Sequence, residues 1–123
     1  DETVPSVRLP KAGAQRRIVA ILATFSWSPD GEIYPVREGR NYIGSDPECD
    51  ICVTQDPQLS SRHATILNRG KGAQFIIDDE KSMNGTLVNG VNVEMKQPLG
   101  NYARISTGAT AWTFIILEPS PGE

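Results

Sequence analysis

The 123-residue sequence contains no apolar stretch that approaches the roughly 20 residues of a membrane-spanning helix. Its 12 basic and 15 acidic residues give a net charge of −3, and the basic residues are scattered along the chain. Membrane insertion and nucleic-acid binding are therefore not expected, because nucleic-acid binding usually needs a clustered positive surface. A hydrophobic content of 38% with 22% charged residues is typical of one globular domain that can bury a core.

Cysteine and histidine are also scarce. Cys49 and Cys52 form the only Cys-x-x-Cys pair, and His63 is the only histidine, so a four-ligand zinc site is incomplete. Residues 50–53 have the pattern of a strand, whereas a thioredoxin-like pair needs a helix N-terminus beside it. We therefore expect structural thiols in a reducing, cytoplasmic compartment, and neither a metal nor a cofactor.

Helical periodicity is missing as well. No segment of ten or more residues free of glycine and proline repeats apolar residues at the spacing of a helix face. Short apolar segments alternate with turn sequences, and Asn89-Gly90 between apolar flanks predicts a tight hairpin. Residues 18–25 and 110–117 are apolar at successive positions, as in strands buried on both faces. The pattern predicts an all-β fold, an antiparallel sandwich or barrel of roughly ten short strands.

The two ends of the chain differ from its middle in composition. Residues 1–16 include two prolines without sustained periodicity, so we expect a flexible tail or linker there. We expect residues 17–118 to form the domain and residues 119–123 to form a short C-terminal tail. The sequence starts without methionine and shows no targeting segment, so it is expected to be part of a larger polypeptide.

Groups that could perform catalysis are few. Ser60, Ser61 and His63 are close in sequence, but residues this near at the start of a strand rarely converge on one reacting atom. The acidic run at residues 78–80 lacks the alternate spacing of a calcium loop. We therefore do not expect an enzyme.

Three polar segments, at residues 44–46, 60–63 and 82–86, lie at predicted junctions between strands and loops. They are rich in hydroxyls, amides and glycines, which offer neutral donors to an oxyanion or a peptide backbone. Each segment alone is also explained as a turn. Loops on a rigid sandwich are, however, where binding usually resides.

Together with their neighbours, these segments resemble the forkhead-associated (FHA) domain family in order and spacing. The matching motifs are Ile43-Gly44, Asp50-Ile51, Leu59-Ser60-x-x-His63-Ala64-x-Ile66 and Asp79-x-x-Ser82-x-Asn84-Gly85-Thr86-x-Val88-Asn89-Gly90. The resemblance covers about residues 18–117 and implies an eleven-stranded antiparallel β-sandwich of the FHA/SMAD-like kind. It also implies a non-enzymatic interaction module that recognises phosphothreonine peptides in signalling or scaffolding, at the loops joining strands 3–4, 4–5 and 6–7.

The resemblance assigns roles to individual residues. It implies that Ser60 bonds the phosphate and that the Asn84 amide holds the ligand main chain. The residues expected at the phosphopeptide site are Ser45, Ser60, Ser61, Arg62, Met83 and Asn84. The residues expected to support the loops are Gly44, His63, Gly85 and Thr86.

Two positions depart from the family pattern. Ser45 stands where the family usually has arginine, and Met83 stands where it usually has threonine or serine. Losing the arginine alone weakens phosphate binding by roughly ten- to a hundredfold, since hydrogen bonds to charged groups contribute about 1.5–3 kcal/mol. Besides Arg62, the candidate compensating cations are Arg40 and Lys81. A second hypothesis therefore stays open: an FHA-like domain that binds partners without phosphate, similar to those of secretion-apparatus ring proteins. In either case the isolated domain is expected to be monomeric.

Overall fold

The computed structural model describes residues 16–70 and 72–117. The predicted tails at residues 1–16 and 119–123 lie almost wholly outside this range. The described residues form strands and turns, and no helix among them could span a membrane.

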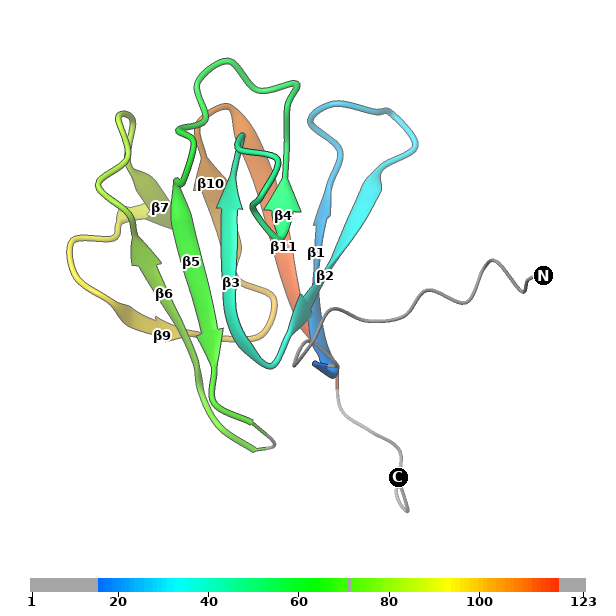
Figure 1. The fold of residues 1–123 in the computed structure, drawn as a ribbon, viewed down its shortest axis with the longest axis vertical. Coiled ribbons are helices and arrows are strands. Elements are labelled where there is room, and N and C mark those ends of the chain that lie inside the picture. Colours follow the sequence, from blue (N-terminus) through cyan, green and yellow to red (C-terminus); the bar gives the residue numbers. More distant parts are fainter. Residues whose placement is uncertain (1–15, 71, 118–123) are drawn as a thin grey trace.

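Eleven strands form two sheets (Figure 1). The strands are β1 (Ile18–Thr24), β2 (Glu32–Arg37), β3 (Gly39–Gly44), β4 (Ile51–Cys52), β5 (Ala64–Asn68), β6 (Phe75–Asp79), β7 (Thr86–Val88), β8 (Val91–Asn92), β9 (Gln97–Leu99), β10 (Arg104–Thr107) and β11 (Thr110–Ile116). The six-stranded sheet has the order β2-β1-β11-β10-β7-β8, and the five-stranded sheet has the order β4-β3-β5-β6-β9. Strands β3 and β4 pair in parallel, and the other paired strands are antiparallel. The predicted all-β sandwich is confirmed.

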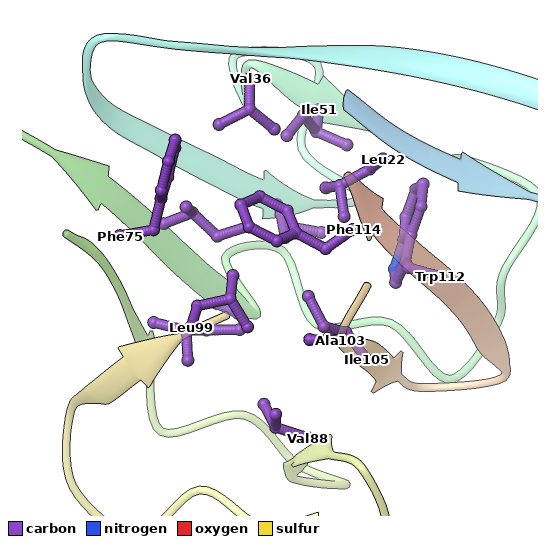
Figure 2. Packing of buried hydrophobic residues seen from close by; sticks show 14 of the residues in the cluster. Leu22, Val36, Ile51, Phe75, Val88, Leu99, Ala103, Ile105, Trp112 and Phe114 are labelled. Atoms are coloured by element: carbon purple, nitrogen blue, oxygen red, sulfur yellow. The ribbon is translucent and has the colours of Figure 1, made fainter. Parts of the chain in front are cut away.

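The core lies between the two sheets and consists of alternate residues from their facing strands (Figure 2). Leu22 of β1 and Phe114 of β11 are fully buried, and the Phe114 ring meets the Phe75 ring edge-on at a centroid distance of 5.1 Å. Trp112 is buried too, and its indole nitrogen donates to the Thr107 hydroxyl at 2.8 Å. Each large apolar side chain buried in this way contributes about 1.5–3 kcal/mol.

Strands β1 and β11 are buried on one face only. Buried residues alternate along both strands with half-buried or exposed ones, so the second face of each strand lies outside the sandwich. The expectation of burial on both faces is therefore wrong, because the described residues include no layer outside the β1 sheet.

The predicted hairpin at Asn89-Gly90 is confirmed. Asn89 and Gly90 both have positive φ, 52° and 84°, and they join the antiparallel strands β7 and β8. Both central residues of a type I′ turn need this conformation.

Candidate functional site

Three loops meet at one end of the sandwich, where β3 and β6 end and β5 and β7 begin (the top of Figure 1). They are the β3–β4 loop (residues 45–50), the β4–β5 loop (residues 53–63) and the β6–β7 loop (residues 80–85). All three polar segments predicted from the sequence lie at this end, so the fold brings together residues that are up to about 40 positions apart in the chain.

The β3–β4 loop lies directly against the β4–β5 loop because Gly44 has no side chain. A Cβ atom on Gly44 would overlap the carbonyl oxygen of Ser61. The close approach lets the Ser45 amide donate to the Ser60 carbonyl oxygen at 3.1 Å and the Asp46 amide donate to the Ser61 carbonyl oxygen at 3.2 Å. Two backbone hydrogen bonds thus hold these loops in one arrangement.

His63 is fully buried and connects two loops through its imidazole ring. The Ser60 amide donates to Nδ1 at 3.1 Å, and Nε2 lies 2.7 Å from the carbonyl oxygen of Gly85. A neutral ring with its proton on Nε2 satisfies both contacts. The ring has no nucleophile as a partner here, because both of its nitrogens are used by backbone groups.

Ser60 lies where the β4–β5 and β6–β7 loops meet. Its hydroxyl oxygen accepts a hydrogen bond from the Met83 amide at 3.0 Å, so its own proton remains available to another acceptor. The Asn84 side-chain nitrogen donates to the Gln58 carbonyl oxygen at 2.9 Å, and within residues 16–70 and 72–117 its second N–H and its amide oxygen have no partner. The Met83 side chain is 86% exposed at the same rim.

Asp79 holds the β6–β7 loop in its turn. Its Oδ1 accepts the hydroxyls of Ser82 at 2.6 Å and Thr86 at 2.7 Å, and the Ser82 hydroxyl accepts the Gly85 amide at 2.9 Å. Burial by itself raises the pKa of Asp79, but the hydrogen bonds from Ser82 and Thr86 outweigh it and lower the pKa below its ordinary value of 3.8. Gly85 has a φ of +83°, which suits glycine at this point of the loop.

Asp56 was not anticipated from the sequence. Its buried carboxylate accepts the Gln58 amide at 2.8 Å, the Ala109 amide at 2.8 Å and the Thr110 hydroxyl at 2.7 Å. It therefore fixes the β4–β5 loop, including the carbonyl that holds Asn84, to the β10–β11 turn. The Asp56-Pro57 turn sequence is the one local signal that could have indicated this role.

The three candidate cations lie in different places. The Arg62 guanidinium lies 4.6 Å from the centre of the Tyr42 ring on β3, and Lys81 is exposed in the β6–β7 loop. Arg40 is near the start of β3, so about 16 Å of extended strand separates it from Ser45. The structure therefore does not bring Arg40 to the loops.

Both thiols contact backbone carbonyls of the three loops. Cys49 donates to the Ser61 carbonyl oxygen at 3.2 Å, and the Cys52 sulfur lies 3.7 Å from the Ser45 carbonyl oxygen. Both cysteines are free, and burial, aided by the charge of Asp46, raises the pKa of Cys49 above its ordinary value. A raised pKa makes a thiol a poorer nucleophile and metal ligand at neutral pH.

The site thus offers hydroxyl and amide donors with one or two exposed cations at its rim. Among residues 16–70 and 72–117, no group of three or more histidine, cysteine, aspartate or glutamate side chains could hold a metal ion. Neutral donors held by a rigid backbone suit recognition of an anion or a peptide main chain.

Several FHA domains are among the solved structures whose fold is similar to that of this chain. An FHA domain studied for phosphothreonine-dependent interactions has a TM-score of 0.70 and 28% identity, and the match covers 83% of this chain and 99% of that one. The FHA domain of CT664 from Chlamydia trachomatis has a TM-score of 0.71 and 26% identity, with 79% and 96% covered. Mycobacterium tuberculosis EmbR in complex with a low-affinity phosphopeptide has a TM-score of 0.72 and 26% identity; the match covers 92% of this chain and 28% of EmbR.

Sequence comparison agrees with the structural one. No protein of curated function is similar enough in sequence to count as a match. The FHA domain profile matches residues 41–108, which include the β3–β4, β4–β5 and β6–β7 loops and more than half of the chain. The chain is a non-enzymatic interaction domain and belongs to the FHA domain family.

Proposed function

We propose that this domain binds phosphothreonine-containing peptides of partner proteins at the end of the sandwich formed by the three loops. The observation that carries the proposal is the position of Ser60, whose hydroxyl accepts the Met83 amide and keeps its proton for a ligand. The phosphothreonine-dependent interactions of one similar FHA domain and the phosphopeptide bound to EmbR support this assignment.

The donors at the loops suit a phosphothreonine peptide. The phosphate carries about −1.5 to −2 charges and three acceptor oxygens. The hydroxyls of Ser45, Ser60 and Ser61 meet these oxygens, and the unused amide atoms of Asn84 bond the peptide main chain on either side. Gly44, His63, Gly85 and Thr86 keep the donors in place through the contacts described above.

Arg62 is the cation that we assign to the phosphate. It is exposed, it follows Ser61 directly, and its guanidinium stacks on Tyr42 of β3, two residues before the end of that strand. Lys81 in the β6–β7 loop is a second, more distant source of positive charge. Because neither residue replaces the arginine that the family usually has at position 45, we expect weak phosphopeptide binding.

A second candidate function is binding of a partner without phosphate. It is favoured by the 86% exposure of Met83, an apolar side chain at a rim where a phosphate reader gains from a hydroxyl. In that case the loops are an interaction surface for an unmodified partner, as the second hypothesis from the sequence states.

Two finer properties complete the proposal. The domain works in a reducing, cytoplasmic compartment, in support of which both thiols are free and bonded to loop carbonyls. The isolated domain is monomeric at low micromolar concentration, and it does not bind nucleic acid, in keeping with its net charge of −3.

Calorimetry at fixed salt tests the proposal, with a degenerate phosphothreonine peptide library and its unphosphorylated twin as ligands. We expect heat of binding from the phosphorylated library only. Ser60→Ala should weaken binding by roughly tenfold, the value of one hydrogen bond to a charged group. Ser106→Ala, a matched change on the outer face of β10, should leave binding unchanged. Equal binding of both libraries would support the phosphate-independent function instead.

A further inference from the structure

The outer face of the β1 sheet has an apolar surface that the binding loops do not use. Two rows of side chains cross β2, β1 and β11, and we call these six residues the outer patch. They are Ile33, Ala23 and Thr113 in one row, and Pro35, Ile21 and Ile115 in the other. Ile33 is 66% exposed, Pro35 is exposed and the other four are half-buried.

This composition is unusual for a face in contact with water. An antiparallel sheet with one solvated face normally alternates apolar residues inside with polar residues outside. The outer patch contains no charge, and two of its three strands, β1 and β11, are those whose sequences indicated burial on both faces. A contiguous apolar surface on the solvated face of a sheet is a candidate interaction site.

We propose that the outer patch packs face to face against the outer patch of a second copy of this domain. A two-fold axis that runs across the strands places the Ile33 row of each copy over the Pro35 row of the other. The patch is therefore complementary to itself, as the interface of a two-fold dimer requires.

The charged residues around the outer patch are arranged so that the same two-fold axis brings opposite charges of the two copies together. Asp30 precedes β2 and Arg37 ends it, so the point midway between them lies beside Ile33, at the centre of the patch. The axis brings the β1–β2 turn that carries Asp30 in each copy towards Arg37 of the other, whose guanidinium also donates to the Arg16 carbonyl oxygen at 3.0 Å. On the opposite flank, Arg104 pairs with Thr113, and Tyr102, which is 67% exposed, bonds to the backbone of Phe114. The axis therefore also places Arg104 of each copy near Tyr102 of the other. A guanidinium is attracted to the face of a tyrosine ring.

The copies meet by their faces and not by their edges. Strand β2 is an edge of its sheet, and Pro35 in the middle of that strand has no N–H to offer an added strand. The outer patch spans three strands about 4.8 Å apart, so two copies bury well under the roughly 1,200 Å² of a stable interface. Association is therefore weak and depends on concentration, which agrees with a monomer at low concentration.

Sedimentation equilibrium of the 123-residue chain from about 10 μM to about 1 mM tests the proposal. We expect the mean mass to rise from monomer towards dimer. Ile33→Asp should weaken association by roughly tenfold or more, because it places a charge in an apolar interface. Val91→Asp is the matched control, because Val91 is also 66% exposed but lies on β8 at the other edge of the sheet. The Val91→Asp variant should associate as strongly as the unmodified chain.

A charge exchange tests the orientation. Asp30→Arg alone should weaken association, and Arg37→Asp added to it should restore association. A monomer at every concentration would overturn the proposal, as would equal loss in Ile33→Asp and Val91→Asp. Failure of the double exchange to restore association, with an unchanged melting temperature, would overturn the two-fold arrangement.

Discussion

Single residues set the strength of the site. Ser45 and Met83 occupy the two positions at which the family pattern usually has arginine and a threonine or serine, and neither provides a charge. A serine hydroxyl offers one donor, whereas the planar fork of arginine meets two phosphate oxygens at once. Under the proposed function we therefore expect the side chains to limit the affinity for phosphate, since the backbone hydrogen bonds between the loops are in place.

Ser45→Arg tests this view. Alone or combined with Met83→Thr, the substitution should raise phosphothreonine-peptide affinity by roughly ten- to a hundredfold, measured by calorimetry at fixed salt because exposed phosphate contacts are screened. Lys81→Arg serves as a control for added guanidinium chemistry without a change of net charge. If the double variant gains nothing, the loops do not hold a phosphate in the proposed way.

His63→Ala tests the support of the loops. The change leaves the Ser60 amide and the Gly85 carbonyl without partners in a fully buried place, at a cost of about 2–4 kcal/mol. The melting temperature should fall by roughly 10 °C or more, and urea unfolding should show the same loss. An unchanged melting temperature together with abolished peptide binding would mean that His63 contacts the ligand and does not support the loops.

Sequence motifs predicted the place of most site residues but not all of their contacts. Gly44, Ser60, His63 and Asn84 lie in one cluster, as their motif implied. Asp56 escaped notice because its partners at residues 109 and 110 are more than 50 positions away, and a long-range contact leaves no local pattern. The distance of Arg40 from the loops followed only from the length and direction of β3.

At the scale of elements, the β6–β7 loop depends on an ionised carboxylate. Asp79 has a folded-state pKa below its ordinary 3.8, so its stabilising effect is fully present above that value and is lost as the pH falls through the folded-state pKa. Stability should therefore decrease in the window below about pH 4, in addition to the general effect of acid.

Urea unfolding between pH 7 and pH 3 measures this effect. Asp79→Asn should lower the free energy of unfolding at pH 7 by about 1–3 kcal/mol, because the Ser82 and Thr86 hydroxyls lose a charged acceptor. The variant should also lose less further stability below pH 4 than the unmodified chain does. Asp78→Asn, a change at the neighbouring outward-facing position of β6, is the control. Parallel curves for the unmodified chain and Asp79→Asn would contradict the role of Asp79.

Strands could be predicted from the sequence where the pattern that indicates them lies within a few consecutive residues. The apolar runs at β1 and β11 and the Asn89-Gly90 hairpin are each contained in a few consecutive residues. The division of eleven strands between two sheets, and the parallel pairing of β3 with β4, depend on contacts between distant segments. That β1 is buried on one face only could not be predicted either. An apolar outward face gives the same sequence pattern whether it is covered by the same chain or, as proposed above, by a second copy.

At the scale of the whole molecule, the sandwich presents two separate surfaces. The three loops lie at one end of the sandwich (Figure 1), and the outer patch lies on the outer face of β2, β1 and β11. A peptide at the loops therefore leaves the outer patch free. Ile33→Asp should accordingly keep the phosphopeptide affinity of the unmodified chain, so a failure of one proposal leaves the other standing.

The most direct test of the central claim is amide chemical-shift mapping during titration with a phosphothreonine peptide library, beside the unphosphorylated twin. If the domain binds phosphothreonine at these loops, amide shifts appear with the phosphorylated library only. We expect them at Ser45, Ser60, Ser61, Met83 and Asn84. Shifts of equal size with both libraries, or shifts gathered away from these loops, would contradict phosphothreonine recognition at this site.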